Sequence, residues 1–228
     1  MVSDSSYEIE DFAFIGRTLP EYRRMLNLDP KSLRGQTVLD CPSGTCSFVA
    51  EACARGVDVT GVDRLYDRTP ASLARTAARD IARTSAAFAG VEDRFVWEFY
   101  DDVSDLRTYR EAAASAFLHD YAHHGERYVE ASLPHLPFAD DAFDVVLSAH
   151  FLFLYDDRLS TTFHVDSVRE LLRVGRELRV FPLHNLDGSR SSVVETVAET
   201  FRDEGRSVTI EPTSFEFQRG ANELLRLR

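Results

Sequence analysis

The residues with the clearest chemical potential lie in two short segments of this 228-residue chain. In the first, a strand-type run ends at Asp40, and the small-residue loop 41–44 leads into a helical pattern that opens near Ser47. Small side chains let a ligand approach the backbone, and a helix N-terminus offers free N–H groups. The second segment, residues 57–63, is a strand that ends at Asp63, whose carboxylate can accept hydrogen bonds from both hydroxyls of a ribose. Together the two segments predict a site for a nucleotide-like ligand.

Two kinds of ligand use this plan, dinucleotides such as NAD and S-adenosylmethionine (SAM). A dinucleotide fingerprint needs three glycines in the pattern G-x-G-x-x-G. This loop has only Gly44, because Pro42 and Ser47 occupy the other two positions. Asp40 would also face a pyrophosphate badly, but it suits a ligand that carries an ammonium group. The loop therefore favours SAM and leaves an NAD-type oxidoreductase as the alternative.

The pattern Asp40-x-Pro42-x-Gly44, followed by Asp63, resembles the first two motifs of class I SAM-dependent methyltransferases, although that family usually has glycine in place of Pro42. Residues 136–148 resemble the family segment L-P-F-x-D-x-x-F-D-x-V before the fourth strand. The resemblance implies an α/β fold, a three-layer α/β/α sandwich around a seven-stranded, mostly parallel sheet with one antiparallel strand. It implies a SAM-dependent methyltransferase; a SAM-binding protein without transferase activity is a further alternative.

The resemblance also assigns the part of the site that would hold the methionine moiety of SAM. Backbone atoms of Cys41, Pro42, Ser43 and Gly44 would approach this moiety. Asp40 would orient the loop and help to hold the amino group of SAM, either directly or through water. These assignments come from the matching positions in the family motif, and we treat them as expectations.

The resemblance implies that residues after the second and third strands bind the ribose and the adenine of SAM. Asp63 would bind the ribose hydroxyls, with Arg64 beside the adenine. Many family members carry an acid after the third strand that binds the adenine amino group, but here Ser132 stands in that place. We therefore expect adenine to be recognised by backbone atoms and by apolar contact with Leu133.

An N-terminal helical segment, residues 9–30, precedes the first strand. Thr18 can cap a helix, with Glu21 three residues later completing a capping box. Methyltransferases of this family often cover the cofactor with such a helix. We accordingly expect Arg17 to pair with the methionine carboxylate and Tyr22 to cover the pocket. The alternative is that the helix only packs on the edge of the sheet.

Residues 66–126 are expected to form a helical insertion within a single domain, residues 1–228. They separate the second strand from the third, which we expect at 127–131, and a plain crossover needs far fewer residues. The insertion is either a cap over the pocket that sets the choice of substrate or a hairpin that extends the core or makes a dimer face. The sequence leaves both interpretations open.

The acceptor side of the site is expected after the fourth strand, residues 143–149, which is apolar enough to be central. Ligands of open α/β sheets bind outside the carboxyl ends of the strands, so His150 is aimed at the methyl group of SAM. His150 can act as a general base. It can also serve only as packing, because transfer from a sulfonium is mainly in-line positioning. Tyr155 is a candidate for binding the substrate.

The net charge of −12 argues against a nucleic-acid partner, because phosphate binding needs a basic face. We expect a small-molecule acceptor that is neutral or cationic, and a monomer or homodimer. Lys31 is the only lysine, so 26 − 1 = 25 basic residues are arginine. This acidic, lysine-poor composition fits a halophilic archaeon, in which salt screens the repulsion, or GC-rich codon bias.

The sequence contains no apolar run near the roughly 20 residues that a membrane span needs. Its first six residues are polar and acidic, unlike a signal peptide, so we expect a cytoplasmic protein. The three cysteines lack the spacing of a metal site. We therefore expect SAM as the cofactor and no metal.

Overall fold

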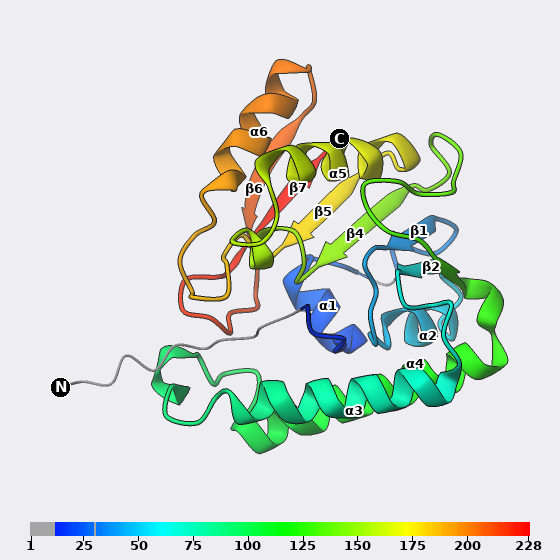
Figure 1. Ribbon diagram of the computed structural model, residues 1–228. Coiled ribbons are helices and arrows are strands. Elements are labelled where there is room, and N and C mark those ends of the chain that lie inside the picture. The colour runs from blue at the N-terminus through cyan, green and yellow to red at the C-terminus, as the bar shows by residue number, and fades with distance from the viewer. Residues whose placement is uncertain (1–11, 30) are drawn as a thin grey trace.

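The computed structural model describes residues 12–29 and 31–228. In this part of the chain seven strands form one sheet, in the order β3-β2-β1-β4-β5-β7-β6 (Figure 1). All neighbours pair in parallel except β7, which runs antiparallel to both β5 and β6. The strands are β1 (Thr37–Asp40), β2 (Asp58–Asp63), β3 (Tyr128–Glu130), β4 (Val145–Ala149), β5 (Leu178–Phe181), β6 (Val208–Pro212) and β7 (Glu223–Leu227). The fold class predicted from the sequence is confirmed.

Helices cover both faces of this sheet and bury an apolar core on each side. The helices form one layer on each face, with α3 and α4 running along the outside of the first layer (Figure 1). The first layer holds α1 (Leu19–Met25), α2 (Phe48–Cys53), α3 (Pro70–Ala86) and α4 (Val103–His123); the second holds α5 (Thr161–Val174) and α6 (Val193–Asp203). Short 3-10 turns lie at Glu92–Arg94 (η1), Gly125–Arg127 (η2) and Phe153–Tyr155 (η3). None of the helices in the described residues is long and apolar enough to cross a membrane.

The order of the strands places the loop after β1 beside the loop after β4. The chain leaves β1 toward β2 on one side, while β4 pairs with the other side of β1. The Cys41 N–H donates to the Leu147 carbonyl over 2.9 Å, which extends the pairing past the end of β1. Because the crossovers reverse direction here, a crevice opens outside the carboxyl ends of these strands. The fold itself therefore brings residues 41–44 and His150 to one place.

The insertion between β2 and β3 is a helical hairpin, as expected, in which α3 packs along α4. Its connecting segment reaches the loop between β6 and β7. The Val96 N–H donates to the Phe217 carbonyl over 2.8 Å, and the rings of Phe95 and Phe217 stack at 4.9 Å. Two segments more than a hundred residues apart in sequence thus meet above the end of the sheet. Residues 9–11 and 30 of the expected N-terminal segment lie outside the described residues.

Candidate functional site

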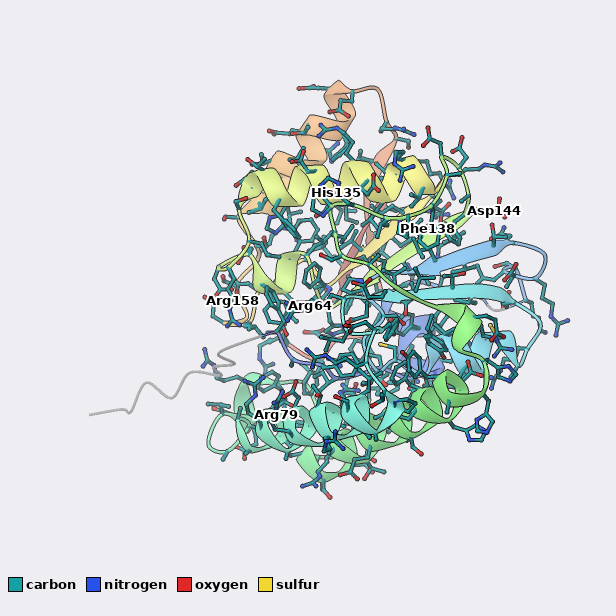
Figure 2. The ribbon with its side chains drawn as sticks, turned by 45° about the vertical axis from the view of Figure 1, so that its right-hand side comes forward. Arg64, Arg79, His135, Phe138, Asp144 and Arg158 are labelled. Carbon is teal, nitrogen blue, oxygen red and sulfur yellow. The ribbon has the colours of Figure 1, made fainter. Side chains whose placement is uncertain are left out.

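A cavity of about 340 Å³ lies at the carboxyl ends of the parallel strands, within the usual size range of small-molecule sites. Its wall combines the N-terminal segment 12–17, the loop after β1, the inserted hairpin and the connections after β4, β5 and β6. In Figure 2, Arg64 and Arg158 mark the side of the molecule toward which the parallel strands run. Every site residue predicted from the sequence lines this cavity except Asp40 and Tyr22.

Asp40 lies fully buried behind the loop. Its carboxylate accepts hydrogen bonds from the Tyr22 hydroxyl, at 2.9 and 3.1 Å, and from the Ser43 hydroxyl, at 2.6 Å. Burial raises the pKa of Asp40 to about 7, against the lowering effect of these two donors. Asp40 therefore holds the loop in place from behind. It does not reach the cavity wall, where a direct contact with the amino group of SAM would be made.

Tyr22 also lies behind the loop, so the expectation that it covers the pocket is wrong. The Tyr22 side chain is fully buried and stacks on Phe48 at 4.5 Å between ring centroids. Its hydroxyl donates a hydrogen bond to Asp40. The reason is the capping box. Thr18 donates its N–H to Glu21 over 2.7 Å, and the helix that starts there turns Tyr22 toward the sheet.

The loop itself presents backbone to the cavity. Gly44 has a φ of +54°, a left-handed conformation that favours glycine, and its N–H donates to Asp63 over 3.2 Å. Tyr66, which the sequence analysis missed, donates its hydroxyl to the Gly44 carbonyl over 2.6 Å. The other Asp63 oxygen accepts the Leu65 N–H at 2.9 Å. Burial raises the pKa of Asp63 to about 6, so its carboxylate is ionised at neutral pH with further acceptor capacity toward the cavity.

The N-terminal segment lies directly on this loop. Gly16 approaches so closely that a Cβ there would fall 2.0 Å from the Thr45 carbonyl oxygen. The Arg17 carbonyl accepts the Ser47 N–H at 3.0 Å, and the Arg17 N–H donates to the Cys46 sulfur over 3.2 Å. These contacts hold the backbone of Arg17 at the cavity wall. Among the described residues, its buried Nε has no hydrogen-bond partner and lies 3.6 Å from a Glu21 carboxylate oxygen. An anion in the cavity could supply that partner.

Arg17 belongs to a buried polar cluster with Glu21, Tyr100 and Arg110. Arg110 donates to Glu21 over 2.6 Å and to the Tyr100 hydroxyl over 2.8 Å, and Tyr100 donates to the same carboxylate. Arg17 lies 3.6 Å from Glu21. Burial disfavours the charge on Arg110, but the Glu21 carboxylate more than offsets this and raises its pKa. With two guanidiniums and one carboxylate, the cluster carries one net positive charge.

The residues expected to hold adenine form one rim of the cavity. Arg64 is exposed, and its guanidinium carbon lies 5.8 Å from the centre of the Phe12 ring (Figure 2). Leu133 is buried, and Ser132 turns its hydroxyl to the Leu133 carbonyl at 3.2 Å. The rim thus offers an apolar side chain, backbone atoms and an exposed cation.

His150 and Tyr155 both reach the cavity wall. His150 has a φ of +54°, and its N–H donates to the Phe181 carbonyl over 2.6 Å. Its Nδ1 is buried and has no hydrogen-bond partner in the part of the chain that the structure describes. Burial, with the charges of Arg17 and Arg110, lowers the pKa of His150 well below its usual value. The imidazole is therefore neutral at physiological pH. Tyr155 accepts the Ala13 N–H at 3.3 Å, so it anchors the N-terminal segment as well as lining the cavity.

A group of apolar side chains lines one part of the cavity. We call it the aromatic chamber, and it consists of Phe88, Phe95, Leu106, Phe181, Phe215 and Phe217. The rings of Phe88, Phe95 and Phe217 pack mutually, with centroids 4.8 to 5.7 Å apart. Half of the chamber comes from the inserted hairpin and its connection, so the insertion builds part of the cavity as well as extending the core.

Comparison with known proteins identifies the family. Residues 101–177 match the family model described as a methyltransferase domain. Over 221 residues the chain is 32% identical to an uncharacterised protein of Methanocaldococcus jannaschii, across 96% of this chain and 97% of that protein. The chain belongs to the family of that protein, and its central part matches a methyltransferase domain. The recognition drawn from the motifs is confirmed, and the oxidoreductase alternative is set aside.

Solved structures similar to this methyltransferase include a SAM-dependent methyltransferase from Aquifex aeolicus, at 14% identity and a TM-score of 0.45, covering 91% of this chain and 92% of that one. Another is magnesium protoporphyrin IX methyltransferase from Synechocystis PCC 6803 with bound SAM, at 12% identity and a TM-score of 0.45, covering 86% and 71%. Likeness at this level carries no information about the acceptor.

Proposed function

We propose that this methyltransferase binds SAM along residues 41–44 and Asp63 and transfers its methyl group to a small-molecule acceptor held in the aromatic chamber. The observation that carries the proposal is the cavity itself. Its wall combines loop backbone, the Asp63 carboxylate and a buried arginine, whose Nε makes no hydrogen bond to the described residues, with a group of apolar side chains. A cofactor with a polar amino-acid moiety and a ribose matches the polar groups.

Arg17 takes the methionine carboxylate in this proposal, which supplies the missing partner of its Nε. Backbone atoms from Cys41 to Gly44 contact the rest of the methionine moiety. Asp63 accepts hydrogen bonds from the ribose hydroxyls while keeping those from Gly44 and Leu65. Arg64, Ser132 and Leu133 flank the adenine. Asp40 acts as a positioning residue, because its hydrogen bonds fix the loop from behind.

His150 stands where the acceptor meets the methyl group. We propose that it contacts the acceptor as a neutral hydrogen-bonding group. A general base needs a pKa near the working pH, and burial beside two arginines lowers the pKa of His150 well below that. This argues against proton removal as its main role. Tyr155 lines the same part of the cavity and holds the N-terminal segment over it.

We further propose that the inserted hairpin selects the acceptor. Of the cavity wall, Phe88, Phe95, Leu106 and Arg110 come from the hairpin and its connection. The Asp40 loop and the N-terminal segment, by contrast, form the part assigned to SAM. A division of this kind lets the insertion change substrate preference without changing the cofactor.

The cofactor assignment can be tested by truncating protein and ligand together. S-adenosylhomocysteine (SAH) has the methionine carboxylate, whereas 5′-methylthioadenosine lacks it and keeps the ribose and adenine. We expect Arg17→Gln to weaken SAH binding by about 1.5–3 kcal/mol and to leave 5′-methylthioadenosine binding unchanged. Asp63→Ala should weaken both ligands. Equal effects of Arg17→Gln on the two ligands, or none on either, would refute the assignment of Arg17.

We also propose a cytoplasmic location, a monomer or homodimer, and no nucleic-acid partner; the net charge of −12 supports the last of these. The same acidic, arginine-rich composition supports a halophilic source. Filter binding of duplex DNA and sedimentation at low and multimolar salt are direct tests. Tight DNA binding, or unfolding in multimolar salt, would count against these expectations.

A further inference from the structure

The wall of the cavity is positively charged, although the protein as a whole is strongly acidic. Among the described residues, the charged side chains that line it are Arg17, Arg64, Arg110 and Asp63. Glu21 and Asp40 are fully buried behind these groups and do not line the cavity. Three cations and one carboxylate thus line the cavity, and Glu21 behind them pairs with Arg110. One net positive charge remains, which favours an anionic acceptor over the neutral or cationic one expected from the net charge of the chain.

Arg110 is the cavity-lining cation to which the SAM assignment gives no ligand group. SAM accounts for Arg17 through its carboxylate and for Asp63 through its ribose, and Arg64 lies at the adenine rim. Arg110 lies one helical turn after Leu106 on the face of α4 that borders the aromatic chamber. Tyr100 and Glu21 hold its guanidinium in a fixed position, so an anion that binds there meets a pre-organised partner.

The aromatic chamber next to this cation suits a flat, apolar body. Five of its six side chains are phenylalanines, and the rings at its centre pack in stacked and edge-on pairs. Phe181 lies 5.6 Å from the His150 ring and 6.0 Å from Phe215, which links the chamber to the end of β4. Aromatic walls of this kind favour planar, polarisable ligands over flexible polar ones.

We propose that the methyl acceptor is an oxyanion on a planar apolar body, an aromatic carboxylate or an acidic phenol, and that Arg110 determines this specificity. The inference rests on the proposed function. Burial is the main reason that the pKa of His150 is lowered, and the charges of Arg17 and Arg110 add to it. These two positive charges would also favour an ionised oxygen beside the imidazole. The sulfonium charge of bound SAM adds to this effect.

The chemistry balances without a base. The acceptor oxygen attacks the methyl carbon of SAM, an O–C bond forms, and the C–S bond breaks with its electron pair left on sulfur. The products are SAH and a methyl ester or methyl ether. Since the oxygen enters ionised, no proton moves in this step, which agrees with an imidazole at His150 that accepts protons poorly.

Calorimetry on the wild-type SAH complex tests the charge preference directly. The probes share one ring system and differ in charge: 2-naphthoate, 2-naphthamide and 2-naphthylmethylamine. We expect 2-naphthoate to bind at least about tenfold more tightly than the amide, with the amine weakest. Equal binding of naphthoate and amide, tightest binding of the amine, or no binding of any probe at millimolar concentration would overturn the inference. If SAH itself failed to bind, the proposed function would fail first.

Variants locate the preference at Arg110. Because Arg110→Gln alone strands the Glu21 carboxylate, the double variant Glu21→Gln/Arg110→Gln keeps the buried cluster balanced. We expect the double variant to bind 2-naphthoate and 2-naphthamide with equal affinity, and its binding of SAH shows whether it is folded. Phe217→Ala is the matched control and should weaken both probes without changing their ratio. A naphthoate preference that survives in a folded double variant would refute the role of Arg110.

Labelled SAM separates the two kinds of oxyanion. The wild-type protein is incubated with methyl-labelled SAM and either 2-naphthoate or 4-nitrophenol, and the product is treated with alkali. An ester releases labelled methanol, whereas an ether retains the label. Transfer to either oxygen supports the inference, while transfer to the nitrogen of 2-naphthylmethylamine but to neither oxygen overturns it.

Discussion

The affinity for the cofactor should depend on pH through Asp63. In the folded protein, burial raises the pKa of this carboxyl to about 6, and only its ionised form can accept hydrogen bonds from two ribose hydroxyls. The ionised share falls from about 91% at pH 7 to about 9% at pH 5 for a pKa of about 6. We therefore expect SAH to bind about tenfold more weakly at pH 5 than at pH 7.

The sign of this effect follows from the direction of the shift. An acid whose pKa is raised in the free protein releases its proton when the ligand binds, so affinity rises with pH up to the raised pKa and then levels off. SAH is the suitable ligand because none of its own groups titrates between pH 5 and 7. Calorimetry at several pH values in this range gives the dissociation constants.

Asp63→Asn is the matched variant, because the amide keeps one acceptor oxygen but cannot titrate. We expect it to bind SAH more weakly than wild type at pH 7 and with little dependence on pH. A wild-type affinity that stays constant between pH 5 and 7 would refute the role of Asp63. So would an Asn variant that kept the tenfold loss, which would assign the titration to another group, such as Asp40.

Three further predictions concern the surroundings of the cofactor. Gly16→Ala should destabilise the fold by about 1–3 kcal/mol in urea unfolding, because the new Cβ meets the Thr45 carbonyl, whereas Gly125→Ala, in open space, should stay within about 0.5 kcal/mol; equal effects would contradict the close packing. Burial raises the pKa of Asp40 to about 7, so the free energy of unfolding of the wild type falls as pH rises from about 4 to 7. Asp40→Asn lacks this loss, and its free energy of unfolding relative to wild type should rise by roughly 4 kcal/mol over that range; a difference independent of pH would refute this. In nitrogen-15 NMR spectra, assigned with His150→Asn, the His150 ring should remain neutral at about pH 6, and a protonated ring there would show that burial does not lower its pKa.

The layered fold could be predicted from the sequence because its signals are local. Each strand of the parallel part is a short apolar run, and the acids Asp40 and Asp63 mark where β1 and β2 end. The Thr18–Glu21 capping box fixed the start of α1 in the same way. These signals depend on residues only a few positions apart, so a single chain displays them.

The charged cluster in the cavity could not be predicted, because its members lie far apart in the sequence. In the sequence, Glu21 has the pattern of a helix-capping residue. No residue near it in the sequence indicates that Arg110, on a helix of the insertion, donates to the same carboxylate. Asp40 shows the opposite problem. Its motif position is right, but whether a strand-end acid faces the ligand or lies behind the loop depends on Tyr22, which belongs to another element.

The cavity wall shows a further limit of reading one sequence. Phe95 and Phe217 come from the insertion and from the loop between β6 and β7, and only the tertiary fold brings their rings together. The net charge of the chain was also a poor guide to the cavity, since charge averaged over a surface says little about one buried site. A buried arginine with an unpartnered nitrogen is a better indicator of what the site binds.

The central claim is that this cavity is a SAM site, and calorimetric titration of the purified protein with SAM, SAH and NAD tests it most directly. The titrations are made at low and at multimolar salt, because a protein from a halophilic source would bind its cofactor only at high salt. We expect SAM and SAH to bind with one site per chain and NAD not to bind. Binding of NAD in preference to SAM, or no binding of SAM and SAH at either salt concentration, would contradict the claim.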